Sequence, residues 1–163
     1  MHLTRFTDYS LRTLIYVGLQ SERLVSIAEI ARAYAISEHH LTKVVHHLGQ
    51  TGLLETVRGR KGGVRLARPP EQICIGAVVR ETEVRTPIIE CRGDEPCAIA
   101  GHCVLERALY EGLRAFLAVL DRYTLADLLN VRRAALRERL HLSPIALSET
   151  ALDPARDPPA TGP

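Results

Sequence analysis

The chain has 163 residues, of which 46% are hydrophobic and 25% charged, which is the composition of one ordinary globular domain with some appended structure. Its N-terminal stretch carries charges within the apolar run and lacks a small-residue cleavage site, so we expect a cytoplasmic protein with neither a signal peptide nor a membrane span. Residues 1–68 hold 10 Lys and Arg against 5 Asp and Glu (+5), whereas the remainder holds 11 against 14 (−3), and such a basic front suits a polyanionic partner such as nucleic acid.

Three segments of the front half repeat apolar residues at the i, i+3, i+4, i+7 spacing of one helix face. These faces are Leu11, Leu14, Ile15 and Gly18, then Ile27, Ile30, Ala31 and Tyr34, then Leu41, Val44, Val45 and Leu48. Each segment also begins with residues that can cap a helix, which are in turn Thr7 and Asp8, Ser26 with Glu29 as a capping box, and Ser37. Only a few residues around Ala35 and Ile36 separate the second segment from the third, so we predict a helix-turn-helix.

A β-hairpin is predicted directly after the third helix. Two short extended runs, Leu53 to Val57 and Val64 to Ala67, flank a Gly-rich connector that carries Arg58, Arg60 and Lys61. The tip of the hairpin is therefore basic.

The third helix would expose a row of polar side chains, which are Ser37, Glu38, His39, His40, Thr42, Lys43 and His46. A polar outer face is ordinary for an amphipathic helix, but the basic hairpin that follows favours a function. Hairpin cations can bind phosphates without regard to sequence, while a helix in the major groove contacts base edges. We therefore predict a mainly α fold with a small β-hairpin wing, in which residues 1–70 form a winged helix-turn-helix domain that binds double-stranded operator DNA.

A further helix is predicted from Ile75 to Glu83, and a Pro- and Gly-punctuated loop from Thr86 to His102. A long helix should then run from Cys103 to about Tyr123, followed by a short one over Thr124 to Asn130. The long helix has one apolar stripe, formed by Leu105, Leu109, Leu113, Phe116, Leu117 and Leu120. Because a three-helix head is too small to cover such a stripe, we expect a symmetric partner helix and hence a homodimer.

Cys91, Cys97 and Cys103 lie in the predicted loop with the spacing C-x5-C-x5-C. Zinc sites usually use closer C-x2–4-C pairs, whereas an iron-sulfur cluster is larger and accepts ligands farther apart on a loop. The spacing therefore favours a 2Fe-2S or 4Fe-4S cluster and does not separate the two. Cys74 lies between two isoleucines and is predicted to be a small buried hydrophobe.

This site lacks a fourth sulfur. Residues within reach along the sequence are His102, Asp94, Glu95 and Glu106, and a ligand from elsewhere in the fold or from another subunit is equally compatible. Unliganded thiols and a zinc-stabilised DNA-binding regulator remain alternatives. An enzyme or electron carrier is disfavoured, because the chain has no nucleotide-binding glycine motif, no second cluster motif and no nucleophile–base pair.

The chain resembles the winged-helix iron-sulfur transcription regulators over residues 1 to about 130. The resemblance depends on the three cysteines and on four stretches that occur in the same order, which are LTRFTDYSLRTLIYV, VRGRKGGVRLARP, IGAVVRETE and FLAVLDRYTLADLL. It implies a homodimer with an N-terminal DNA-binding head and a long dimerisation helix, and we assign the cluster-binding loop and this helix to residues 71–142. From Ser143 onward the Pro-rich composition with few large apolar residues predicts a disordered tail over 143–163.

Within this family, the chain is most similar to the repressors that sense nitric oxide. The branch that controls iron-sulfur assembly has a His three residues after the last Cys, where this chain has Glu106. The resemblance implies that the intact cluster holds the protein on operators of nitrosative-stress genes, and that nitrosylation releases it. It also implies an acidic fourth ligand from the partner subunit, matching Asp8, although Asp8 can equally favour the helix start or pair with Arg12. A cluster- or redox-responsive regulator of another regulon is the alternative.

Overall fold

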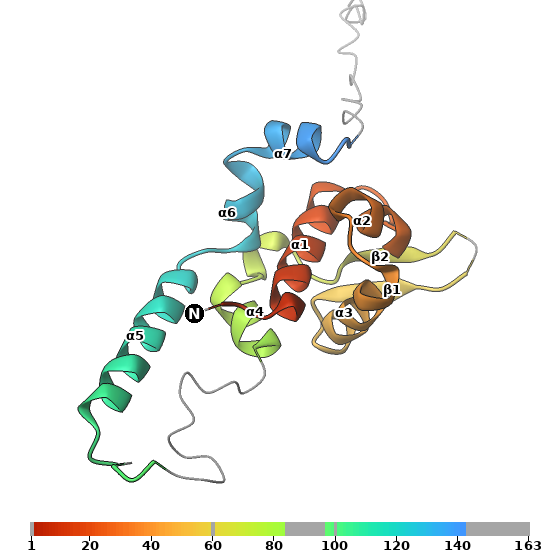
Figure 1. Ribbon diagram of the computed structural model, residues 1–163. Helices are drawn as coiled ribbons and strands as arrows, with labels where there is room; N and C mark the ends of the chain where they lie inside the picture. The colour runs from red at the N-terminus through yellow and green to blue at the C-terminus, as the bar shows by residue number, and fades with distance from the viewer. Residues whose placement is uncertain (1, 60, 84–96, 100, 143–163) are drawn as a thin grey trace, which may run out of the picture.

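A computed structural model of the chain describes residues 2–59, 61–83, 97–99 and 101–142. In these ranges the protein is mainly helical and has one small antiparallel hairpin, as the sequence predicted (Figure 1). The helices are α1 (Arg5–Leu19), α2 (Ile27–Tyr34), α3 (Glu38–Gln50), α4 (Ile75–Thr82), α5 (Val104–Leu120), α6 (Leu125–Asn130) and α7 (Arg133–Arg139). The strands are β1 (Leu54–Val57) and β2 (Gly63–Leu66), and a 3₁₀ turn, η1, covers Pro70–Gln72. No helix in the described part of the chain is long and apolar enough to cross a membrane.

Helix α1 begins earlier than the sequence predicted. Thr4 is the N-cap, and its hydroxyl oxygen accepts a hydrogen bond of 3.2 Å from the backbone N–H of Thr7. Thr7 and Asp8 therefore lie inside the first turns of the helix, and the prediction that they cap it is wrong. The backbone N–H of Thr4 in turn donates a 2.6 Å hydrogen bond to the carboxylate of Glu83, at the end of α4. No local pattern reveals this contact, because the two residues are 79 positions apart.

Helices α2 and α3 form the predicted helix-turn-helix. The capping box is present, since the backbone N–H of Ser26 donates to Glu29 at 2.8 Å and that of Glu29 donates to the Ser26 hydroxyl at 3.2 Å. Ala35 ends α2 in the left-handed conformation, with φ 52°, which lets the chain turn sharply into α3. Ser37 occupies the N-cap position of α3 as predicted, but its side chain makes no capping hydrogen bond.

The predicted apolar faces are confirmed to different degrees. All four residues of the α3 face are buried, whereas α2 buries Ile30 and Ala31 and leaves Ile27 and Tyr34 partly exposed. In α1 only Leu14 and Gly18 of the predicted face are buried, and Leu11 and Ile15 remain partly exposed. The buried surface of α1 instead includes residues outside that face, which are Thr7, Ser10, Thr13, Tyr16, Val17 and Leu19. Helix α1 is buried on several sides because it contacts α3, α4, α6 and β2. It is therefore the central element of the fold.

The hairpin is confirmed, with β1 beginning one residue later than the predicted run and β2 shifted by one residue toward the N-terminus. Its register pairs Leu54 with Leu66 at one end and Val57 with Gly63 at the other. Backbone hydrogen bonds of 3.0 and 2.8 Å between Val25 and Val64 attach the hairpin to the segment between α1 and α2. The hairpin therefore cannot swing freely relative to the helix-turn-helix.

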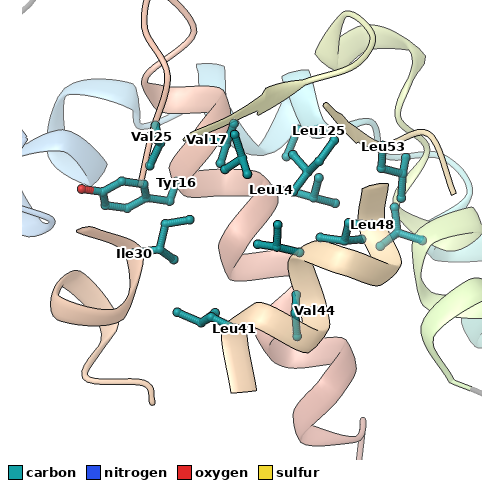
Figure 2. Close-up of a cluster of buried hydrophobic side chains, with 14 of the residues drawn as sticks. Leu14, Tyr16, Val17, Val25, Ile30, Leu41, Val44, Leu48, Leu53 and Leu125 are labelled. Atoms are coloured by element: carbon teal, nitrogen blue, oxygen red, sulfur yellow. The ribbon is translucent and has the colours of Figure 1, made fainter. Parts of the chain in front are cut away.

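One hydrophobic core joins the head to the segments that follow it. Figure 2 shows side chains from α1, α2 and α3 in one cluster, with Leu125 of α6 beside Leu14 of α1. Residues beyond the hairpin that belong to the same core are Ile73, Ile75, Val78, Leu125 and Leu129. Gly18 lets α1 and α6 approach closely, because a Cβ at this position would lie 2.7 Å from Cδ1 of Leu129.

Cys74 is not the buried hydrophobe that the sequence predicted. It is partly exposed, and its Sγ lies 3.7 Å from the carbonyl oxygen and 3.6 Å from Oδ1 of Asp121. Arg80 binds the same carboxylate, with Nη1 3.1 Å from Oδ2. Asp121 thus joins α4 to the end of α5.

The remaining helices differ from the prediction at their ends. Helix α4 ends at Thr82 rather than Glu83, and α5 covers Val104–Leu120 rather than continuing to Tyr123. Helix α7 and η1 were not predicted, and the tail predicted for 143–163 lies outside the described residues.

We expect Glu29→Gln to lower the free energy of unfolding by about 1 kcal/mol at pH 7. Although burial raises it, hydrogen bonds from Arg23 and Ser26 lower the pKa of Glu29 from 4.5 to about 2. Because the folded state has the lower pKa, this stabilisation is complete above pH 4.5 and is lost as the pH falls toward 2. Urea unfolding of parent and variant at several pH values should show a gap that closes in acid. Glu22→Gln, at an exposed position, is the control, and a Glu29→Gln gap that persists unchanged in acid would contradict the assignment.

Candidate nucleic-acid interface and metal centre

The outer face of α3 is available for a partner. All the predicted contact residues on it are exposed, which are Ser37, Glu38, His39, His40, Thr42, Lys43 and His46. The opposite face is fixed by the buried side chains of the core, so the polar face is held on a rigid element. The formal charges of Lys43 and Glu38 cancel, and affinity for phosphates must therefore come mainly from elsewhere.

Neighbouring elements fix the orientation of α3. The rings of His40 and Tyr9 of α1 lie 6.2 Å apart. His47, which sequence reasoning did not single out, faces inward, with its ring centroid 5.3 Å from that of Phe6 and its Nε2 4.0 Å from a carboxylate oxygen of Glu81. Helix α3 is thus in contact with both α1 and α4.

The hairpin supplies cations beside α3. Arg58 and Lys61 are exposed as predicted, whereas Arg60 lies outside the described residues. Two further arginines were missed because strand position alone does not show what they contact. Arg65 forms a salt bridge with Glu55 on the neighbouring strand, and the Arg68 guanidinium donates hydrogen bonds of 2.9 to 3.3 Å to the backbone carbonyls at the end of α3.

Two of the three predicted cysteine ligands can be placed. Cys97 is exposed, and Cys103 is half-buried at the N-cap of α5, and both are free thiols. Cys91 lies outside the described residues, as do the candidate ligands Asp94 and Glu95. A hollow of about 380 Å³ opens beside Cys103, lined by Gly101, His102, Cys103, Val104, Glu106, Arg107 and Tyr110. A hollow of this size beside the Cys103 thiol is larger than a single ion needs and leaves room for a polynuclear cluster.

Asp8 does not join the described cysteines within one chain. Asp8, Cys97 and Cys103 are all described, yet no three His, Cys, Asp or Glu side chains in the described ranges form a group that could hold a metal ion. Instead, the half-exposed Asp8 accepts a 2.9 Å hydrogen bond from Nε of Arg12, so the alternative contact considered for it from the sequence is present. Among the described residues, Asp8 of the same chain therefore does not complete the site.

Arg12 also connects Asp8 to the helix-turn-helix. Its guanidinium carbon lies 5.8 Å from the ring centroid of Tyr34, the last residue of α2. Burial raises the pKa of Tyr34 to about 12, so its ring is a neutral, partly enclosed surface for the cation. The Asp8 carboxylate is thus linked through Arg12 to Tyr34, which lies at the turn between α2 and α3.

Helix α5 has an apolar stripe that the described part of the chain covers only in part. None of the six predicted stripe residues is buried, and the one buried residue of the helix is Glu106. Leu105 is 63% exposed and Val104 80%. Figure 1 shows α5 on the outside of the fold, apart from the helix-turn-helix.

Comparisons with known proteins agree with this arrangement. Residues 3–131 match the model of the Rrf2 family, described as iron-dependent transcriptional regulators. The HTH-type transcriptional regulator NsrR of Geobacillus kaustophilus is 52% identical over 146 residues, which cover 85% of this chain and 99% of the relative. NsrR of Bacillus subtilis is 50% identical over 131 residues, covering 78% of this chain and 90% of the relative.

Solved structures show the same fold. The global cysteine regulator CymR of B. subtilis has a TM-score of 0.63 at 30% identity, covering 78% of this chain and 95% of that one. IscR of T. potens has a TM-score of 0.67 at 26% identity, covering 83% and 90%. The family resemblance drawn from the sequence is confirmed by these matches.

We expect Lys61→Gln and Lys43→Gln to weaken DNA binding in different ways. The hairpin variant should lose affinity for all duplexes to a similar extent, with a salt slope lower by about one, because one phosphate contact is removed. The α3 variant should instead change the preferred base at one operator position, as expected for a side chain that contacts a base edge. Titrations at several salt concentrations against operator and random duplexes measure both effects.

The control for these variants is Arg122→Gln, which removes an exposed cation just beyond α5. If Lys61→Gln matches this control in affinity and in salt slope, the hairpin is not a phosphate-binding element.

Proposed function

Because the chain belongs to the Rrf2 family of iron-dependent transcriptional regulators, we propose that it is a repressor whose hold on operator DNA is switched by nitric oxide at an iron-sulfur cluster. It is a transcription regulator and not an enzyme, as its relatives are. The observation that carries the proposal is the C-x5-C-x5-C loop directly after a winged helix-turn-helix head, in a chain half identical to regulators named NsrR.

In this proposal Cys91, Cys97 and Cys103 hold the cluster, and Asp8 of the partner subunit completes the ligand set. Two observations support the assignment: the free thiol of Cys103 lines the hollow at the start of α5, and Asp8, Cys97 and Cys103 of one chain do not form a group that could hold a metal ion. When bound, the cluster would supply the iron at which nitric oxide reacts. A carboxylate is a harder and less persistent ligand than a thiolate, so the Asp8 position would be the one that opens first.

The partly exposed stripe of α5 supports a homodimer. Pairing this helix with its copy would remove the exposed surface of Leu105 and its neighbours on the stripe from water, at about 25 cal/mol for each Å² of apolar surface buried. A two-fold dimer presents two identical heads, so the operator should be a near-palindrome with half-sites about 10 to 10.5 base pairs apart, or a multiple of that. In each head the polar face of α3 would contact bases, while Arg58, Arg60 and Lys61 would contact phosphates.

Arg12 provides a route from the cluster to the DNA-binding surface. If Asp8 binds iron, its charge is shared with the metal and its hydrogen bond with Arg12 weakens. Arg12 can then interact more strongly with the ring of Tyr34, which lies next to the turn that orients α3. Loss of the iron would return Asp8 to Arg12 and move the equilibrium toward a head arrangement that does not match both half-sites.

We expect Asp8→Ala to retain a cluster on the three cysteines while making it more labile and uncoupling it from DNA binding. Asp8→Cys should slow the response to nitric oxide, because a thiolate replaces the hard oxygen ligand. Cys97→Ala should abolish the cluster and Cys74→Ser should leave it intact. Anaerobic absorbance with iron and sulfide analysis, followed by nitric oxide titration during DNA binding, measures each effect.

The same absorbance measurement distinguishes the alternatives. A colourless protein with one zinc per chain would replace the cluster proposal, and an intact cluster insensitive to nitric oxide would indicate a redox-responsive regulator of other genes. Asp8 is excluded as a ligand if both of its variants match the parent in spectrum, nitric oxide rate and operator affinity.

We expect Leu113→Glu to convert the dimer into a monomer, because it places a charge in the middle of the α5 stripe. Ala115→Glu, at an exposed α5 position outside the predicted stripe, is the matched control and should remain dimeric. Sedimentation equilibrium gives the mass directly. Unchanged mass for Leu113→Glu would mean that another surface forms the dimer.

A further inference from the structure

A bidentate ion pair spans the exposed face of the hairpin. Glu55 and Arg65 are cross-strand partners in the β1–β2 register. Nε of Arg65 donates to one carboxylate oxygen of Glu55 at 2.9 Å, and Nη2 donates to the other at 3.0 Å. The two side chains are 49% and 55% exposed, so neither is held by burial. The fork of the guanidinium is therefore occupied on a surface that remains open to solvent.

The cations at the hairpin tip differ from Arg65 in their ion pairing. Neither Arg58 nor Lys61 forms a salt bridge in the described part of the chain. Arg65 is two residues from Gly63, which belongs to the last pair before the tip, a distance of about 7 Å along a strand. Arg65 and the tip cations Arg58 and Lys61 are all exposed on the same hairpin, so we take Arg65 to be available to a backbone phosphate when the hairpin meets DNA.

We propose that Glu55 is a specificity-determining residue of the DNA-binding head, because it holds Arg65 and withholds one phosphate contact from DNA of any sequence. The inference rests on the DNA binding of the proposed function and does not depend on the cluster. Glu55 also repels phosphates itself, so its charge opposes the attraction that the tip provides.

This restraint acts more strongly on random DNA than on the operator. Non-specific binding consists almost entirely of phosphate contacts, and a head on random DNA can shift to make as many as possible. On the operator, base contacts of α3 fix the register and limit what the hairpin can reach. Withholding one cation therefore lowers the competing affinity more than the specific one and raises the ratio between them.

The pair is not needed to hold the hairpin in place. A bidentate cross-strand pair stabilises a hairpin only modestly when, as here, solvent screens both charges. The hairpin is attached independently, by the Val25–Val64 hydrogen bonds and by Arg68 at the end of α3. Removing the Glu55 charge should therefore leave the fold intact, which makes its effect on DNA measurable.

The test is Glu55→Gln in the anaerobically purified full chain, titrated with a random-sequence duplex and with the operator over a range of salt concentrations. We expect affinity for the random duplex to rise about fivefold at 0.15 M salt, with a salt slope steeper by about one and the operator-to-random ratio reduced. Arg65→Gln should not gain affinity, and Glu55→Gln with Arg65→Gln should return close to the parent. Glu22→Gln removes the same charge from an exposed site outside the hairpin and is the matched control.

Three results would overturn the role proposed for Glu55 or the DNA binding on which it depends. A Glu55→Gln chain that matches either the parent or Glu22→Gln on random DNA overturns the inference, and so does a double variant that keeps the full gain, because the gain would then not act through Arg65. If the parent binds no duplex, the proposed function fails together with this inference, whereas binding by the parent without an effect of Glu55→Gln overturns the inference alone. Equal circular dichroism and thermal unfolding of all variants show that the fold is unchanged.

Discussion

Burial of one face of α3 against α1 is the interaction on which the DNA-facing surface depends. Leu41, Val44 and Leu48 are at most 1% exposed, and each fully buried side chain of this size contributes about 1.5 to 3 kcal/mol. Because side chains at this spacing point to one side of a helix, their burial forces the intervening polar residues outward. The position of the polar face is thus a consequence of core packing, and no contact on the outer side is needed to hold it.

The same core ties the head to the rest of the chain. Leu125 and Leu129 of α6 pack with the head, and Gly18 allows the close approach of α6 to α1. The end of α4 adds two polar contacts, from Glu83 to the start of α1 and from Glu81 to His47 of α3. Since the cysteine loop follows α4 directly, a change in that loop would act on a helix already joined to α1 and to α3. This is a physical basis for coupling, because packed elements move together.

What could be predicted from the sequence was set by local physics. The α3 face, the Ser26–Glu29 capping box and the hairpin all depend on residues within a few positions of one another, and all are present. The errors involve distant partners. Thr4 rather than Thr7 is the N-cap of α1, and the backbone N–H of Thr4 donates a hydrogen bond to Glu83. Cys74 contacts Asp121 at a partly exposed position instead of lying in the hydrophobic core. The same reason explains why Arg65 and Arg68 were missed, since their roles depend on strand register and on the end of α3. The exposure of the seven α3 side chains was predictable, whereas the ligand set remains a prediction.

The charges of the head are divided between elements that do different work. On α3, Lys43 and Glu38 cancel, which leaves its exposed polar groups to contribute through the geometry of hydrogen bonds rather than through net attraction. The hairpin tip provides that attraction, and Glu55 limits it by binding Arg65. A regulator that must leave its operator when a signal arrives cannot rely on sequence-independent attraction, because that term persists whatever the state of the switch. Affinity that depends instead on the matched spacing of two heads can be removed by a small change at α1. There Asp8 contacts Arg12, and Arg12 contacts Tyr34 at the end of α2. A weakly charged recognition face and a restrained wing are therefore what a switchable repressor of this architecture requires.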